Sequence, residues 1–116
     1  KSAHEISAEL QDLAERARAG RLSAGEMRGG CFTVSNAGAL GGGAFTPIIN
    51  WPESAILGMG RARIEAVYRR GTFVPRLLLP LSLSYDHRLI DGADGVRFLE
   101  WLAETLADTA HLAWRT

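Results

Sequence analysis

The sequence contains a single cysteine, Cys31, among its 116 residues. One cysteine excludes an intramolecular disulfide, which favours a reducing compartment: the cytoplasm, or the mitochondrial matrix if the source is eukaryotic. Because this cysteine lies in the apolar run 31–34, we expect it to be a buried small hydrophobic residue rather than a reactive thiol.

An excess of charge and a long apolar run are also missing. The 13 lysines and arginines balance 13 aspartates and glutamates, so no basic surface for nucleic acid or an anionic membrane is predicted. No apolar run is long enough to span a bilayer, and the N-terminal residues lack the apolar segment of a signal peptide. Since 47% of the residues are hydrophobic, we expect a soluble globular protein with no nucleic-acid or membrane partner.

Metal and nucleotide motifs are absent as well. The three histidines, His4, His87 and His111, have neither the spacing nor the cysteine partners of a zinc site. The glycine-rich segment 36–43 lacks both a Gly-Lys-Ser/Thr sequence and the glycine spacing of a dinucleotide loop. We therefore expect no bound metal, and a loop that positions Ser35 and the asparagine after it.

Two segments have the apolar periodicity of helices. The first opens at a capping box, residues 2–5, and ends at Gly20. A second capping box, residues 23–26, predicts a short helical turn that ends before the glycines at 29–30. The second long helix follows residues 91–92 and runs to near the C-terminus. Its apolar positions are Val96, Leu99, Leu102 or Ala103, Leu106 and Ala110.

The segments between these helices have the character of strands. Residues 31–35, 54–60 and 61–70 predict three strands, and a turn at 70–71 returns the chain as one long apolar strand, 74–83, in a hairpin. Segment 45–52 contains two prolines, which confine it to a sheet edge or to an extended connection. We expect it to cover a sheet edge. With no repeat or internal linker, the chain is one domain or one piece of a domain.

The last strand stops, and the last helix starts, on either side of His87. Asp91 lies four residues further on and Gly92 lets the backbone turn, so a carboxylate and a helix N-terminus can both reach the imidazole. The positive end of the helix would favour the neutral imidazole and stabilise an anion nearby. This arrangement suits a general base in thiol chemistry. The alternative is a turn histidine followed by an aspartate that caps the helix.

Three stretches, GCFTVSNAG at 30–38, FTPIINWPESAILG at 45–58 and DHRLIDG at 86–92, resemble conserved segments of the dihydrolipoyl acyltransferases of 2-oxo acid dehydrogenase complexes. The histidine motif resembles chloramphenicol acetyltransferase more distantly. The resemblance covers residues 1–116 and implies an α/β fold, a chloramphenicol acetyltransferase-like mixed sheet packed with helices. It corresponds to the C-terminal portion of the catalytic domain, without the other half or the lipoyl and subunit-binding domains. We therefore expect an uncovered apolar sheet face or edge that needs a partner.

This resemblance implies that the chain is an acyltransferase. Such an enzyme moves an acyl group from an S-acyl dihydrolipoyl group to coenzyme A, without a metal or a covalent enzyme intermediate. Coenzyme A is then a substrate, and the lipoyl group is the acyl donor on a separate domain. His87 would be the general base, Ser35 would stabilise the oxyanion, and Asp91 would orient or hydrogen-bond. Taken by itself, Ser35 is more simply a strand-end serine that caps a turn. Asp86 and Arg88 would each form an ion pair with a neighbouring segment.

The resemblance also implies a homotrimer with active sites at the subunit interfaces, where the histidine of one subunit faces the serine of the next. Trimers would build a larger hollow core that binds the other subunits of the dehydrogenase complex. Two alternatives remain: a non-catalytic assembly subunit or inactive fragment, and a stand-alone acetyltransferase of the chloramphenicol type. The sequence does not identify the acyl group, although pyruvate and branched-chain complexes are favoured.

Overall fold

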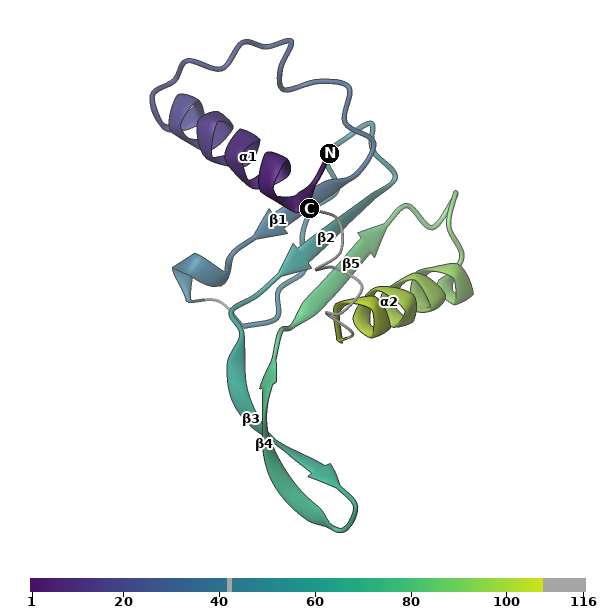
Figure 1. The fold of residues 1–116 in the computed structure, drawn as a ribbon. Coiled ribbons are helices and arrows are strands. Elements are labelled where there is room, and N and C mark those ends of the chain that lie inside the picture. The colour runs from purple at the N-terminus through teal and green to yellow at the C-terminus, as the bar shows by residue number, and fades with distance from the viewer. Residues whose placement is uncertain (42, 108–116) are drawn as a thin grey trace. The chain divides into compact units, whose positions relative to one another are not determined.

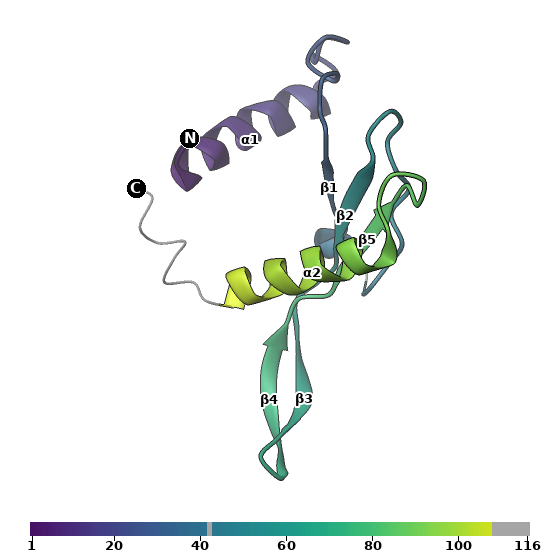
Figure 2. The ribbon, with the colours of Figure 1, turned by 90° about the vertical axis from the view of Figure 1, so that its right-hand side faces the viewer.

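The computed structural model describes residues 1–41 and 43–107, which fall into two compact units. One unit comprises Lys1–Gly30 and the chain from Arg97, and the other comprises Cys31–Val96. The second unit holds the strands of the described chain, which Figures 1 and 2 show as a three-stranded sheet continued by a hairpin. The mixed α/β composition predicted from the sequence is confirmed.

Helix α1 (Ala3–Arg18) begins where the sequence predicts. The Ser2 hydroxyl accepts a hydrogen bond from the Glu5 N–H at 3.2 Å, and the Glu5 carboxylate accepts one from the Ser2 N–H at 2.6 Å. Both bonds satisfy N–H groups that the start of a helix leaves unpaired. The Ser2 N–H, and then the Ser2 hydroxyl, lower the pKa of the Glu5 carboxyl group. Gly20 follows the helix with φ of +65°, a conformation that favours glycine.

The second capping box forms its hydrogen bonds without forming a helix. The Ser23 N–H donates to the Glu26 carboxylate at 2.9 Å, and the Glu26 N–H donates to the Ser23 hydroxyl at 3.3 Å, but residues 24–27 are only turns. The short helix predicted here is therefore wrong. Glycines at 25 and 29 leave too few helix-forming residues between them to propagate the hydrogen-bonded ladder.

The three-stranded sheet has β2 (Ala55–Met59) at its centre, parallel to β1 (Thr33–Asn36) and antiparallel to β5 (Leu81–Tyr85). Ala55, Ile56 and Leu57, which all belong to β2, are buried. Strand β1 starts two residues later than predicted. Cys31 precedes it in an exposed position, so the prediction of a buried cysteine is wrong.

The connection at 45–52 crosses a face of β2 rather than an edge of the sheet. A Cβ atom at Gly58 would lie 3.0 Å from the Phe45 ring and 3.2 Å from the Pro47 ring, so both side chains rest on the strand's backbone. Pro47 is buried there. The prediction of an edge cover is wrong because glycine at position 58 lets this extended segment approach the sheet face.

In the loop predicted after β1, the described residues include the 3₁₀ turn η1 (Gly38–Leu40). The Asn36 side-chain carbonyl accepts a hydrogen bond from the Gly38 N–H at 3.0 Å, and the Ala37 N–H donates to the Met59 carbonyl at 3.0 Å. The bond to Met59 extends the pairing of β1 with β2 into the start of the loop, and the Asn36 bond holds the turn that follows.

Strands β3 (Arg63–Arg69) and β4 (Thr72–Leu78) form the predicted hairpin. Arg70 has φ of +48° and Gly71 has φ of +88°, the left-handed conformation that a two-residue hairpin turn requires at both positions. The single strand predicted at 74–83 is instead β4 followed by β5. Pro80 separates them because it has no N–H for a ladder, while its carbonyl accepts the Gly60 N–H at 3.0 Å.

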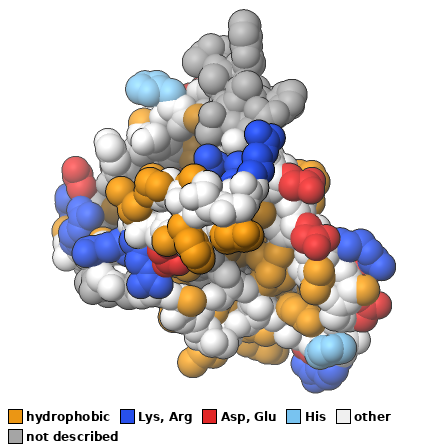
Figure 3. Space-filling view, turned by 90° about the horizontal axis from the view of Figure 1, so that it is seen from below, with side chains coloured by type: hydrophobic (Ala, Val, Ile, Leu, Met, Phe, Trp, Pro, Cys, Tyr) orange, Lys and Arg blue, Asp and Glu red, His pale blue; other side chains and the backbone are white. Residues whose placement is uncertain are grey.

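One face of the hairpin is apolar and exposed. Residues opposite each other in an antiparallel pair point to the same face, and three successive pairs on one face are apolar. They are Ile64 with Leu77, Ala66 with Pro75, and Tyr68 with Phe73. All six are exposed, Ile64 by 74% and Leu77 by 71%. In the view from below the hairpin, hydrophobic side chains lie at the surface beside arginine or lysine side chains (Figure 3). An uncovered apolar face is therefore present, as the sequence predicts.

Helix α2 (Gly92–Ala107) confirms the helix predicted after Asp91 as far as residue 107. Ala110 and His111 lie outside the described residues. Within the ranges that the structure describes, no helix is both long enough and apolar enough to cross a membrane.

Candidate active site

His87 lies in a turn that the end of β5 holds in place. The Asp86 N–H donates to the Ser54 carbonyl at 2.8 Å, which prolongs the pairing of β5 with β2 by one residue. The Leu89 and Ile90 N–H groups donate to the Asp86 carbonyl at 2.9 and 3.0 Å. The backbone around His87 is thus fixed on both sides, while the histidine itself is exposed.

Asp86 and Arg88 form an ion pair with each other. The Arg88 Nη2 donates to Asp86 Oδ2 at 2.6 Å, and Nε lies 2.9 and 3.1 Å from the two carboxylate oxygens. The Arg88 guanidinium and N–H together lower the pKa of Asp86 to about 2. The prediction that each residue pairs with a neighbouring segment is wrong, since the tight turn brings the two side chains together.

Asp91 caps α2. Its Oδ1 accepts a hydrogen bond from the Asp94 N–H at 2.9 Å, and its carbonyl accepts one from the Gly95 N–H at 3.1 Å. An aspartate at this position satisfies an unpaired N–H of the first turn and complements the positive end of the helix. The cap that the sequence offered as an alternative interpretation is therefore present at Asp91.

His87 opens onto a pocket of about 360 Å³. Its lining residues are Ile49, Trp51, Glu53, Tyr85, Asp86, His87 and Arg88. The first two come from the segment that crosses β2, and the last four come from the end of β5 and the turn after it. The pocket thus has an apolar and aromatic wall beside an ion pair, with an imidazole at its rim.

Glu53 and Tyr85 are pocket residues that sequence reasoning missed. The Glu53 carboxylate accepts hydrogen bonds from the Thr33 hydroxyl at 2.6 Å and from the Asn50 side-chain amide at 3.2 Å, which ties the pocket to the start of β1. Tyr85 lies two residues before His87, as the last residue of the strand that leads into the turn. That spacing could have identified Tyr85 from the sequence, whereas the Glu53 contacts depend on long-range packing.

The structure does not bring Ser35 to the His87 pocket. Ser35, half-buried on β1, lies opposite Gly58 of β2, whereas the strand end that leads to His87 lies opposite Ala55. These positions are about 10 Å apart along the sheet, since a strand rises roughly 3.3 Å per residue, and β1 and β5 lie on opposite sides of β2. Of the three predicted site residues, only His87 and Asp91 share one turn.

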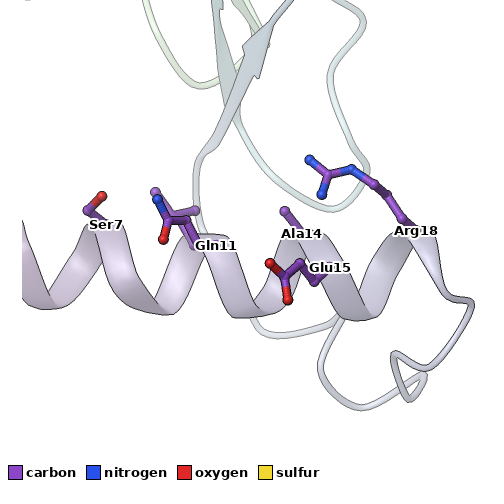
Figure 4. Close-up of a pocket in the computed structure, with 6 residues that line it drawn as sticks. Ser7, Gln11, Ala14, Glu15 and Arg18 are labelled. Atoms are coloured by element: carbon purple, nitrogen blue, oxygen red, sulfur yellow. The ribbon is translucent and has the colours of Figure 1, made fainter.

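Two other hollows lack comparable chemistry. One, of about 230 Å³, runs along a single face of α1 and is lined by Ser7, Leu10, Gln11, Ala14, Glu15 and Arg18 (Figure 4). The other lies on the hairpin beside Arg69, Arg70 and Arg76. Neither contains a histidine or cysteine. No group of three potential metal ligands occurs among residues 1–41 and 43–107. The pocket at His87 is the candidate active site.

Similarity to known proteins extends over nearly the whole chain. The family model for the 2-oxoacid dehydrogenases acyltransferase (catalytic domain) matches residues 1–114. The chain is 51% identical over 108 residues to the dihydrolipoyllysine-residue acetyltransferase component of the pyruvate dehydrogenase complex of Haemophilus influenzae. It is 54% identical over 108 residues to the same component of Pseudomonas aeruginosa. Each match covers 93% of this chain but 19% and 20% of the two relatives, so the chain spans about a fifth of their length.

Solved structures of such enzymes have the same fold. The dihydrolipoamide acetyltransferase of Azotobacter vinelandii matches with a TM-score of 0.92 and 51% identity. The cubic core of a pyruvate dehydrogenase multienzyme complex matches with a TM-score of 0.92 and 50% identity. Both matches cover 97% of this chain and 46% of the solved chain, and they confirm the predicted fold class. This chain therefore belongs to the family of 2-oxoacid dehydrogenase acyltransferase catalytic domains.

Proposed function

We propose that this chain is part of a dihydrolipoyllysine-residue acetyltransferase of a pyruvate dehydrogenase complex. It would move an acetyl group from an S-acetyl dihydrolipoyl group, carried on a separate lipoyl domain, to coenzyme A. Relatives from Haemophilus influenzae, Pseudomonas aeruginosa and Bacillus subtilis carry this name at 48–54% identity. These names favour acetyl over other acyl groups and argue against the stand-alone acetyltransferase.

One observation carries the assignment of the site residues. The Azotobacter vinelandii structure belongs to an investigation of the role of a serine, a histidine and an asparagine in that enzyme's catalytic mechanism. There the serine precedes the histidine by 52 residues, and the asparagine follows it by four. In this chain Ser35 precedes His87 by 52 residues, and Asp91 follows it by four. The spacing supports His87 and Ser35 as counterparts, with aspartate in place of asparagine at the third position.

The chemistry follows from these residues. Neutral His87 takes the proton from the coenzyme A thiol, and the thiolate attacks the carbonyl carbon of the S-acetyl group. The Ser35 hydroxyl donates a hydrogen bond to the resulting oxyanion. The bond from carbon to the dihydrolipoyl sulfur then breaks, and His87 returns its proton to that departing thiolate. A general base contributes about a hundredfold to ten-thousandfold in rate, and one oxyanion donor about a hundredfold to a thousandfold. Asp91 has an orienting role, since its cap fixes the far end of the turn that carries the base.

The proposed site combines two copies of the chain. Because the register of the sheet separates Ser35 from His87 in one copy, the serine facing each histidine would come from a neighbour. A cyclic trimer supplies such a head-to-tail contact at every interface. The match to a cubic core, an assembly of many copies, supports this arrangement. We propose a homotrimer that builds a larger core and binds the other subunits of the complex.

Complementation between two inactive variants tests the proposal in the full-length enzyme. His87→Ala and Ser35→Ala chains are each assayed for acetyl transfer to coenzyme A, and both should show a greatly lowered turnover number. When the two are unfolded together in equal amounts and reassembled, about one interface in four receives both intact residues. Activity should return to roughly a quarter of the wild-type value per site, if intact sites act independently.

His4→Ala is the matched control for removal of an exposed histidine, since His4 lies in the first turn of α1 and outside the pocket. Wild-type protein taken through the same cycle controls for reassembly. Near-normal turnover in the His87→Ala enzyme would refute the proposed base. A mixture no more active than its parents, with the wild-type control intact, would refute the shared site alone.

A further inference from the structure

The imidazole of His87 has a close aromatic neighbour, Tyr85. The two ring centroids lie 5.6 Å apart, with an angle of 44° between the ring planes. Within the described part of the chain, no hydrogen bond to the imidazole is formed, and the histidine is exposed. An exposed side chain without hydrogen bonds has several rotamers of similar energy, so contact with a fixed ring is what limits its orientation.

Tyr85 is itself fixed from two directions. As the last residue of β5, it lies opposite Ala55, one of the buried residues of the central strand. On its other side the ring lies against the first turns of α2, where a Cβ atom at Gly95 would be only 2.8 Å from the ring. A Cβ atom at Gly92 would lie 3.9 Å from the tyrosine hydroxyl. The ring therefore lies directly on helix backbone that carries no side chain there.

We propose that Tyr85 is a positioning residue for His87, with its ring, held against α2 at the end of β5, fixing the plane of the imidazole. This inference rests on the proposed role of His87 as general base. A base must lie within hydrogen-bond reach of the proton it removes, and a misplacement of about 1 Å can cost a hundredfold in rate. The ring contributes through its contact with the imidazole and not through its hydroxyl, which lies near Gly92 of the helix.

Substitutions of Tyr85 in the full-length enzyme test the proposal. Tyr85→Leu removes the ring and should lower kcat about tenfold or more, with KM for coenzyme A changed less than about twofold. Tyr85→Phe keeps the ring and should restore kcat to within about twofold of wild type. Tyr68→Leu is the matched control, because Tyr68 forms a similar aromatic pair with Phe73 at 5.4 Å but lies on the hairpin.

Repeating the substitution in a His87→Ala background separates positioning from stability. If Tyr85 acts through the imidazole, Tyr85→Leu should change the residual rate of the His87→Ala enzyme less than about twofold. If the ring only stabilises the fold, the same fractional loss appears in both backgrounds, and the proposal is overturned. A normal kcat in Tyr85→Leu, or a low kcat in Tyr85→Phe, also overturns it.

Three further outcomes keep the test decisive. If Tyr85→Leu fails to fold, Tyr85→Met fills the same space without a planar ring and takes its place in the cycle. If His87→Ala itself retains normal turnover, the proposed function fails and the positioning role falls with it. If His87→Ala is inactive while Tyr85 variants behave alike in both backgrounds, only the positioning role fails.

Discussion

The Asp91 carboxylate stabilises the first turn of α2, and Asp91 follows the proposed base, His87, by four residues. Its hydrogen bond to the Asp94 N–H is local, so the spacing of the two residues in the sequence is enough to predict it. The ion pair of Asp86 with Arg88 is harder to predict. Two side chains with a single residue between them in the sequence contact each other only in a tight turn. The burial predicted for Cys31 is wrong because an apolar run indicates a strand but does not show which segments pack over that strand.

Substitution of Asp91 should separate its capping role from its charge. Asp91→Ala removes the acceptor and should lower the free energy of unfolding by about 1 kcal/mol, whereas Asp91→Asn should change it by a few tenths, because asparagine caps helices comparably. Thermal or denaturant unfolding of the two variants measures the difference. Since the third residue in the Azotobacter vinelandii enzyme is an asparagine, Asp91→Asn should also retain activity. Equal destabilisation by both substitutions would show that the charge, not the cap, stabilises α2.

Acid should weaken the turn at His87 through Asp86. The Arg88 guanidinium and N–H lower the pKa of this carboxyl from 3.8 to about 2 in the folded state, so its stabilisation is complete above about pH 4 and is lost as the pH falls toward 2. Glu26, which is hydrogen-bonded to Ser23 and Arg16, also has a pKa of about 2, so it contributes to the loss of stability over the same pH range. The stability of wild type minus that of Asp86→Asn, measured from pH 5 to pH 2, isolates Asp86. A difference independent of pH would show that the ion pair contributes nothing.

At the scale of elements, the sequence predicts local periodicity well and long-range packing poorly. α1, α2 and the β3–β4 hairpin follow from residue spacing, a capping box and a turn glycine. The connection at 45–52 was expected at an edge, since its prolines show only that it cannot join a ladder. Gly58, in the middle of β2, is the residue that lets it cross the sheet face instead. Pro80 indicates a break between two strands, but the apolar residues on both sides of it favour the prediction of one continuous strand.

Gly58→Ala should show how closely that connection packs. The added methyl would lie 3.0 Å from the Phe45 ring and 3.2 Å from Pro47, in the middle of the central strand. Overpacking at such a site costs about 1–3 kcal/mol, so we expect a lower midpoint in denaturant unfolding. Gly25→Ala is the control, since a Cβ atom there would meet only the Ser23 hydroxyl at 3.9 Å. A Gly58→Ala protein as stable as wild type would mean that the connection shifts without loss.

For the whole molecule, the described chain buries few hydrophobic side chains. Ala55, Ile56, Leu57 and Pro47 are buried, while large apolar residues of the hairpin and of both helices are exposed. The likeness to solved structures extends over 46% of their length. The resemblance in sequence led us to expect an uncovered apolar face, but which residues form it follows from the register of β3 and β4, which the sequence does not specify.

A protein restricted to residues 1–116 should therefore need a partner for stability. Alone, it should bind an apolar dye strongly and melt without a sharp transition, because its exposed apolar surface is larger than a soluble monomer usually tolerates. Dye fluorescence, calorimetry and sedimentation measure these properties together. A monomer with a cooperative melt and no dye binding would contradict the expectation.

The hydrogen bond between Gly60 and Pro80 has a consequence for the order of folding. A hairpin forms in about 1–10 μs because its contacts are local. By contrast, β2 and β5 are separated by more than 20 residues, so their direct pairing closes a longer loop at a larger cost in entropy. Once β3 and β4 have paired, residues 60 and 80 are adjacent, and β2 and β5 can pair from that point outward. Arg70→Asn, which places a residue suited to positive φ in the turn, should therefore speed refolding in stopped-flow experiments and leave unfolding nearly unchanged. Slower unfolding with unchanged refolding would instead place hairpin formation after the rate-limiting step.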